Sequence, residues 1–327
     1  MLASRLLRCA YDRQFISSLF ATSVYTGSGA ARTITNGIDL AGKGGMVWTK
    51  CRINTAALGG SSIDHHISDS AIGAGNFLIP NAANAAQAFA EISFNSDGYY
   101  ISGGRTEINY NTNTFVSWTF RKAPKFFDCG TFVAGSATNR RISHALSVAP
   151  GMVILKRTDS TENWSTYHRS LGASSGLSLN TSAAAGTIAS VWGVTDPTAY
   201  DFGVNEAQLC TPGGTYVWYA FAHDTSTDGL IQCGSFTTDG SGNASVNHGW
   251  SAGIQFAQIK ARTTTGDWEM FDTARTPAWS SSDARLRANL SNVEDSVTRL
   301  SASGTSVSFT GLSASQTYIY VFVVAPT

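Results

Sequence analysis

Two acidic residues in the segment "DWEMFD", Glu269 and Asp272, are the first candidates for acid–base chemistry. Glycoside hydrolysis needs a pair of carboxyl groups that flank the same sugar bond. Side chains alternate between the two faces of a strand, so a spacing of three residues places this pair on opposite faces. We therefore predict no catalytic residues here and interpret both carboxylates as solvated positions at a strand edge.

A second polar cluster, "IDHHISD", contains Asp64, His65, His66 and Asp69. Histidine and carboxylate side chains are common metal ligands, so a metal site in this loop is an alternative to a plain polar loop. We favour the polar loop and predict neither a metal nor a cofactor. The five cysteines show no CxxC spacing, and we interpret most of them as small buried residues.

The segment "SDGYYISGG" places Tyr99 and Tyr100 beside glycines. Exposed tyrosines can stack on sugar rings, so this pair is the candidate ligand-binding site, although one of two neighbouring strand residues normally points into the core. The sequence contains no phosphate-binding loop, no GxSxG elbow and no HExxH motif. We therefore predict that the protein is not an enzyme.

Three copies of one aromatic strand are the strongest pattern in the chain. The segments "TFVSWTFR", "TYVWYAFA" and "TYIYVFVV" begin at Thr114, Thr215 and Thr317. A strand with a lysine precedes each copy, and these lysines are Lys50, Lys156 and Lys260. A repeat at a nearly constant period indicates copies of one structural unit.

Further positions align in the same order in every copy. They are Phe20, Phe127 and Ile231, then Tyr25, Phe132 and Phe236, then Asn36, His144 and His248, and then His65, Trp164 and Trp268. An asparagine follows at Asn81, at Asn180 and at either Asn289 or Asn292. Because several independent positions align in the same order, the evidence for three copies of one unit is strong.

Each copy contains short strand-like segments separated by turn signals such as "SDG", "PGG" and "DGSGN". We predict an all-β fold of three tandem β-sandwich or jelly-roll-like modules with a short N-terminal arm. The expected boundaries are 1–18 for the arm and 19–124, 125–228 and 229–327 for the modules. Because the linkers are short, the modules should contact each other, and a pseudo-threefold block is one possible arrangement.

Alternation assigns the faces of the aromatic strand. We place Val116, Trp118 and Phe120 in the core, together with their counterparts Val217, Tyr219, Phe221, Ile319, Val321 and Val323. The opposite face carries Tyr216 and Trp218 in the second copy, and it is too aromatic there to be solvated. It should pack either on a second sheet or on a neighbouring repeat.

Composition and charge exclude several classes of protein. Charged residues make up 13% of the chain, against roughly 25% in average soluble proteins, which suits hydroxyl-rich β structure. A formal net charge of zero argues against a nucleic-acid-binding body and favours association with other copies. No stretch reaches the roughly 18 apolar residues that a membrane span requires.

The N-terminal segment "MLASRLLRCAYDRQF" places Leu2, Leu6 and Cys9 roughly on one helical face. Arginines interrupt it, so it lacks the apolar core of a secretory signal. A transit peptide and a frayed tail are alternatives. We favour a short amphipathic arm that docks on a partner protein.

The segments "YTGSGAARTITNGIDLAGKGGMVWTK", "FNSDGYYISGG", "FVSWTFRKAPKFFDCGTF", "SHALSVAPGMVILKR" and "NWSTYHRSLG" resemble a repeat found in virion structural proteins of tailed bacteriophages. The resemblance extends from residue 18 to the end, and the third copy departs most, with "AGIQF" in place of the "PGM" turn. It implies β-sandwich modules of tail, fibre, collar or head-decoration proteins, and it supplies no catalytic residues.

We therefore expect a non-enzymatic structural component of a tailed-phage virion that is associated with the tail, as a fibre, collar or adaptor-linked protein, and acts through protein–protein contacts. Expected partners are other virion proteins, bound through the arm, and further copies of the chain. A capsid decoration or cement protein is the alternative within this class. A carbohydrate-binding module that recognises a host surface glycan is the alternative from another class.

Overall fold

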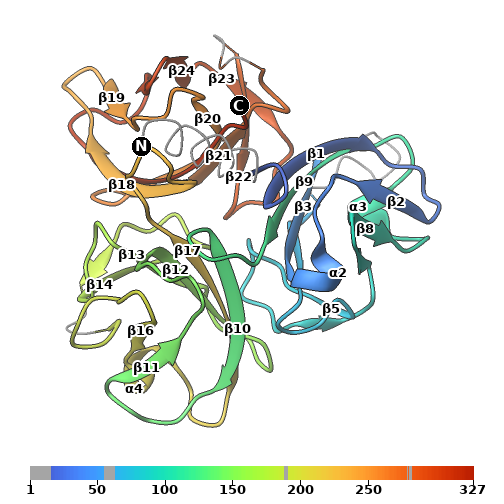
Figure 1. Ribbon diagram of the computed structural model, residues 1–327, viewed down its shortest axis with the longest axis horizontal. Helices are drawn as coiled ribbons and strands as arrows, with labels where there is room; N and C mark the ends of the chain where they lie inside the picture. The colour runs from blue at the N-terminus through green and yellow to red at the C-terminus, as the bar shows by residue number, and fades with distance from the viewer. Residues whose placement is uncertain (1–15, 55–62, 188–190, 278, 280–281) are drawn as a thin grey trace, which may run out of the picture.

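A computed structural model describes residues 16–327 except 55–62, 188–190, 278 and 280–281 (Figure 1). Strands account for 45% of the residues and helices for 4%, which confirms the predicted all-β class. None of the helices in this described part of the chain is long and apolar enough to cross a membrane.

Three consecutive segments of the chain form three sets of antiparallel sheets, which we call modules 1, 2 and 3. Module 1 contains β1 (Phe20–Thr26), β2 (Arg32–Thr35), α2 (Leu40–Lys43), β3 (Gly45–Ile53), β4 (His66–Asp69), β5 (Asn76–Phe77), β6 (Gln87–Ala88), β7 (Ile92–Asn95), β8 (Gly98–Ile101), α3 (Thr106–Asn109) and β9 (Thr114–Arg121). Module 2 contains β10 (Phe127–Val133), β11 (Arg140–Ser143), β12 (Pro150–Arg157), β13 (Ser165–His168), β14 (Ser175–Ser178), β15 (Gly186–Thr187), β16 (Asp201–Val204), α4 (Glu206–Leu209) and β17 (Thr215–Ala222). Module 3 contains β18 (Ile231–Thr237), β19 (Ala244–Asn247), β20 (Ile254–Ala261), β21 (Trp268–Asp272), β22 (Asp283–Arg287), β23 (Asp295–Val297), β24 (Leu300–Ser303), β25 (Ser306–Phe309) and β26 (Thr317–Val324).

The main sheets of the three modules share one strand order. They run β1-β9-β3-β4 in module 1, β10-β17-β12-β13 in module 2 and β18-β26-β20-β21 in module 3, with β14-β15 and β22-β23 extending the last two. A smaller sheet accompanies each: β2-β8-β7, β11-β16 and β19-β25-β24. This repeated two-sheet layout is the sandwich-like module that the turn spacing predicted.

The register of the main sheets confirms the sequence alignment. The lysine strand pairs with the aromatic strand in every module, so that Lys50 lies opposite Val116, Lys156 opposite Val217 and Lys260 opposite Ile319. The strands are rich in aromatic and β-branched residues, which suit a pleated surface buried on both sides. The three copies therefore share one register along the central part of these strands, at 46–51, 152–157 and 256–261.

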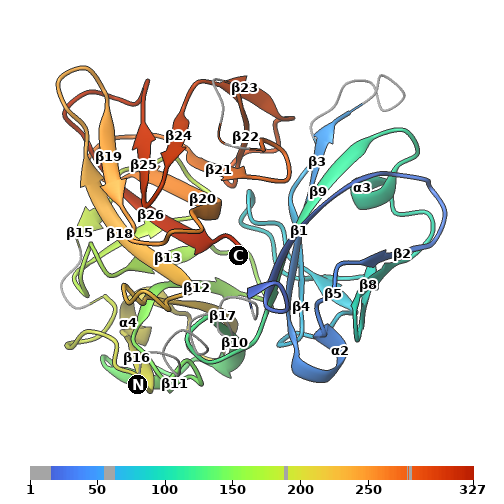
Figure 2. The ribbon, with the colours of Figure 1, turned by 45° about the horizontal axis from the view of Figure 1, so that its top comes forward.

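The three modules surround a common centre (Figure 1), and in the turned view module 1 stands apart on the right while modules 2 and 3 overlap on the left (Figure 2). The ring of Phe120 in module 1 lies 5.4 Å from that of Phe221 in module 2 and 6.2 Å from that of Phe256 in module 3. These rings belong to one large apolar cluster that contains residues of all three modules. The predicted core face of the aromatic strand is thus buried between modules.

The opposite face of the aromatic strand packs inside its own module. In module 1, Phe115 stacks on Tyr25 at 5.4 Å, within a separate apolar cluster that includes Tyr99 and Ile101 of the small sheet. In module 2, the ring of Trp218 meets Phe202 of β16 at 5.5 Å. Of the two arrangements left open by the sequence, this face therefore covers the second sheet.

The N-terminal boundary needs a correction. Ile16 was expected to belong to the arm, but it is completely buried in the central cluster, as is Leu19. The packed body therefore includes Ile16. The residues predicted to dock on a partner, Leu2, Leu6 and Cys9, lie outside the described residues.

Candidate functional site

The three aligned lysines are completely buried and join the modules. They are Lys50, Lys156 and Lys260. Their Nζ atoms donate to backbone carbonyls of a neighbouring module, at Ser291 (3.0 Å), Ala83 (3.0 Å) and Ser182 (3.2 Å) respectively. Each also donates to a carbonyl of its own module. Burial of the ammonium group lowers the pKa of all three lysines to about 8.

The asparagines shape the loops that receive these lysines. The Oδ1 atoms of Asn81, Asn180 and Asn289 accept the backbone N–H of His65 (2.8 Å), Trp164 (3.0 Å) and Trp268 (2.9 Å). Asn289, and not Asn292, is therefore the counterpart in the third copy. In each module the carbonyl that accepts the neighbour's lysine lies two residues after this asparagine.

Backbone bonds repeat the same cyclic pattern. The N–H groups of Ala86, Ala185 and Glu294 donate to the carbonyls of Thr158 (2.9 Å), Arg262 (2.9 Å) and Arg52 (2.8 Å). Module 1 thus contacts module 2, module 2 contacts module 3, and module 3 returns to module 1. The bonds close a ring of three heterologous interfaces built from equivalent residues.

A third set of contacts starts at the ends of β4, β13 and β21. Asp69 accepts the hydroxyl of Tyr219 at 2.6 Å, and Asp272 accepts the indole N–H of Trp118 at 2.9 Å. His168 bonds through Nε2 to the carbonyl of Tyr320 at 3.1 Å. Burial lowers the pKa of His168 to about 3, so the neutral ring carries its proton on Nε2 and donates it to that carbonyl.

Glu269 and Asp272 lie on opposite faces of β21, as the odd spacing predicts. The prediction that both carboxylates are solvated at a strand edge was wrong. Asp272 is fully buried at the module interface, where Arg275 Nε donates to it at 2.6 Å. Glu269 accepts bonds from Arg285 at 2.8 Å and from Arg299 at 2.9 Å. Both carboxylates are engaged in ion pairs with arginines.

The polar residues of "IDHHISD" do not form one cluster, because each contacts a different partner. Asp64 accepts from Asn81, the ring of His65 accepts the indole N–H of Trp48 at 2.9 Å, and His66 contacts Glu91 at 2.8 Å. Among the residues that the structure describes, no group of three His, Cys, Asp or Glu could hold a metal ion. The polar residues of this segment are instead structural contacts.

The two tyrosines of the predicted ligand-binding site, Tyr99 and Tyr100, differ in burial. Tyr99 is completely buried and its hydroxyl donates to Ser117 at 2.7 Å, which excludes it as an exposed stacking surface. Tyr100, on the other face of β8, is 38% exposed and remains a prediction. Alternation along the strand is the physical reason for the difference.

One equivalent position carries side chains of different chemistry in the three modules, and the sequence analysis did not identify it. In β4, β13 and β21, the residue that pairs with the position just before the aligned lysine is His66, Ser165 or Glu269. A second equivalent set, Glu91, Val191 and Arg299, is defined by carbonyls that accept from Ser102, Asn205 and Thr310. Modules 1 and 3 thus contain the hydrogen-bonded pair His66–Glu91 and the ion pair Glu269–Arg299, while module 2 contains Ser165 and Val191.

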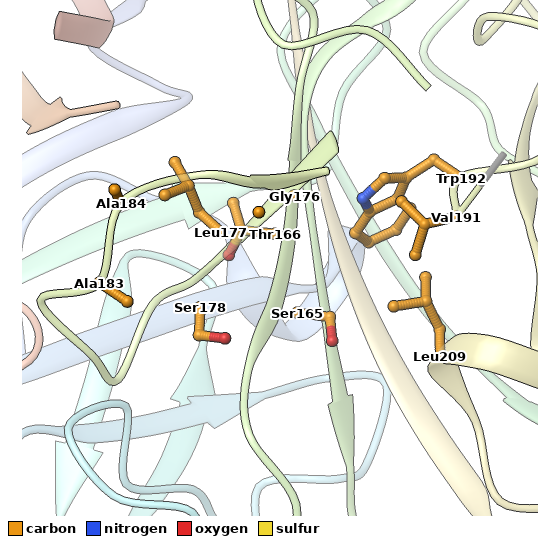
Figure 3. Close-up of a pocket in the computed structure, with 11 residues that line it drawn as sticks. Ser165, Thr166, Gly176, Leu177, Ser178, Ala183, Ala184, Val191, Trp192 and Leu209 are labelled. Carbon is orange, nitrogen blue, oxygen red and sulfur yellow. The ribbon is translucent and has the colours of Figure 1, made fainter. Parts of the chain in front are cut away.

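Module 2 has a pocket at this position, with a volume of about 230 Å³ (Figure 3). It is lined by Ser165, Thr166, Gly176, Leu177, Ser178, Ala183, Ala184, Gly186, Val191, Trp192 and Leu209. The indole ring of Trp192 lies beside Gly176 and close to Val191 (Figure 3). Equivalent residues of unlike chemistry leave no signal for a repeat alignment, so the sequence could not have located this pocket.

A family model described as a domain of unknown function, DUF7483, matches residues 16–324. This range covers nearly the whole chain and includes all three modules. No curated protein matches the chain significantly.

Proposed function

Since the chain belongs to the DUF7483 family, whose function is unknown, we propose from the molecule itself that it is a structural component of a tailed-bacteriophage virion. In this proposal it is tail-associated and acts through protein–protein contacts. The resemblance of its repeat to phage virion proteins supplies the class of particle. The proposal places the protein in the virion, where it contacts other virion proteins through the N-terminal segment and further copies of itself.

The observation that carries the proposal is the use of polar groups as connections between modules. The three aligned lysines, which would be candidates for chemistry in a cleft, are each bonded to carbonyls of a neighbouring module. Buried polar groups of this kind must be satisfied and fix one arrangement of the parts. A single rigid body of three fused modules suits a protein that transmits load or fills a defined place in a particle.

The low charge supports the same role. The chain has 22 basic and 22 acidic residues, so it carries no net charge that would repel other copies or neighbouring proteins. Several of its acidic residues are already paired with arginines inside modules, as in the Glu269–Arg299 and Arg285–Asp295 pairs. The outer surface can therefore associate through neutral polar and apolar contacts.

The test is mass spectrometry and electron cryomicroscopy of tailed-phage particles from the source that encodes this sequence. We expect the protein in purified particles, at a copy number that matches the rotational symmetry of the tail. A copy number that matches the capsomers of the head would support the decoration or cement alternative instead. Absence of the protein from infectious particles would contradict both.

The arm has a separate test. Deleting residues 1–15 leaves Ile16 and every other described residue of the central cluster in place, so we expect the protein to remain folded. We expect the truncated protein to be absent from particles assembled in its presence. A truncated protein that joins particles as well as the full chain would contradict docking through Leu2, Leu6 and Cys9.

A further inference from the structure

We propose that the pocket of module 2 binds the acetamido group of an N-acetylated sugar, such as a terminal N-acetylhexosamine of a surface glycan. This inference goes beyond the structural role proposed above and does not depend on it. It concerns a site other than Tyr100, which lies on β8 of module 1. Four features of the pocket carry the inference.

The first feature is the absence of charge. Among the described residues that line the pocket, none is acidic or basic. The equivalent places in modules 1 and 3 contain His66 with Glu91 and Glu269 with Arg299, which bond to each other. A cavity of similar volume in module 3 has this Glu269–Arg299 pair in its wall, so its charges are already satisfied. Among these three equivalent places, as far as the structure describes their residues, the one in module 2 contains no charged side chain, which suits a neutral ligand.

The second feature is an indole N–H that lacks an acceptor. Trp192 is 1% exposed, and its Nε1 has no hydrogen-bond partner among the described residues. This nitrogen lies 3.2 Å from the point that a Cβ on Gly176 would occupy, so the missing side chain leaves it open to the pocket. A buried donor without an acceptor is costly. A carbonyl oxygen of a ligand would satisfy it.

The third feature is the apolar wall beside that N–H. Leu177, Val191 and Leu209 line the pocket from β14, from the segment before Trp192 and from α4 (Figure 3). A small methyl group would lose its contact with water against these side chains. An acetamido group presents a carbonyl oxygen and a methyl group on the same carbon, so it matches both the N–H donor and the wall.

The fourth feature is a pair of hydroxyl residues with limited space. Ser165 and Ser178 lie directly opposite each other on β13 and β14 and both line the pocket. Their hydroxyls can donate to and accept from the hydroxyls of a sugar ring. The volume of about 230 Å³ lies below the range typical of drug-sized ligands, which favours one sugar residue over a longer ligand.

The experiment measures binding of methyl glycosides of N-acetylglucosamine and N-acetylgalactosamine to the full chain by saturation-transfer NMR and titration. Methyl glucoside and methyl galactoside, which lack the acetamido group, are the matched ligands. We expect the acetamido sugars to bind and the plain sugars to bind at least about tenfold more weakly, because they lose one hydrogen bond and the methyl contact.

Three variants localise the binding. Trp192→Phe removes the N–H and should weaken binding about fivefold to tenfold. Ser165→Leu should abolish binding by filling the pocket, and the backbone accepts a large side chain because His66 and Glu269 occupy the equivalent positions. Trp250→Phe is the control, since its buried N–H also lacks an acceptor among the described residues but does not line this pocket.

Several outcomes would overturn the inference. They are no binding of either acetamido sugar at tens of millimolar, equal binding of acetamido and plain sugars, and unchanged binding after both Trp192→Phe and Ser165→Leu. Tighter binding of an N-acetylated dipeptide amide than of any sugar would assign the pocket to a peptide instead. Near-ultraviolet circular dichroism checks that each variant is folded. If one of the two pocket variants does not fold, the binding measured with the other still tests the inference.

Discussion

Replacing Lys156 by methionine should change the free energy of unfolding by an amount that depends strongly on pH. The lysine is fully buried and donates to the carbonyls of Ala83 at 3.0 Å and Glu162 at 2.8 Å. In the variant, the carbonyl of Ala83 still accepts the backbone N–H of Glu162. The carbonyl of Glu162 loses Lys156, its one donor among the described residues. We estimate the loss of these bonds at about 3 kcal/mol.

The charge of Lys156 acts in the opposite direction at neutral pH. Burial lowers its pKa from 10.5 to about 8, and a shift of this size corresponds to about 3 kcal/mol against the ammonium form. Methionine removes this penalty, so the two terms nearly cancel at pH 7. Between pH 8 and 10.5 the unfolded chain binds the proton that the folded chain has released, so the lysine's contribution to stability rises with pH.

The free energies of unfolding of the wild type and Lys156→Met should therefore be nearly equal at pH 7. The wild type should gain about 2.5 kcal/mol over the variant by pH 10. Denaturant titrations at both pH values measure this, and other titrating groups cancel in the difference because both proteins contain them. Lys43→Met is the control, because Lys43 is exposed. A difference between wild type and Lys156→Met that does not change with pH, or a wild type that loses stability relative to the variant as pH rises, would refute the reasoning.

Two further predictions concern the interfaces. Asp272→Asn should lower the free energy of unfolding by about 3 kcal/mol, because Arg275 is fully buried and keeps only Glu294 as a carboxylate partner; a denaturant titration showing under 1 kcal/mol would contradict a net role for this pair. Residues 125–228 expressed alone should not fold cooperatively, because the face with Tyr219 is covered by the other modules; a well-dispersed amide NMR spectrum of that fragment would contradict this.

The repeat alignment predicted the strands well because it depends on several anchors at once. The lysines fall at equivalent places in the sheets and the asparagines make equivalent contacts in the loops, and alternation identified the apolar face of the aromatic strand. The sequence could not say what covers each face. Both faces of this strand are buried, one by a neighbouring module and one by the second sheet, and local periodicity carries no information about distant partners.

The same limit explains the errors at single residues. The spacing of Glu269 and Asp272 gave their faces but not their burial, because burial depends on distant partners. Glu269 pairs with Arg299 from a later strand, and Asp272 accepts the indole N–H of Trp118 from another module. The lysines were visible as aligned positions, yet a lysine on a strand is normally exposed. Their burial depends on carbonyls that another module supplies, and the chain does not encode that contact locally.

The closed ring of interfaces explains where the modules are free to differ. Tandem repeats that stack in an open array expose their ends and need caps. Here the loop after Asn289 in module 3 receives Lys50 of module 1, so neither end module leaves an interface uncovered. A change at any bonded position would affect a buried contact, whereas Ser165 of β13 and Val191 of the segment before Trp192 both line a pocket built from residues of their own module. Divergence there costs no interface, and it is where a ligand pocket could arise in one copy of three.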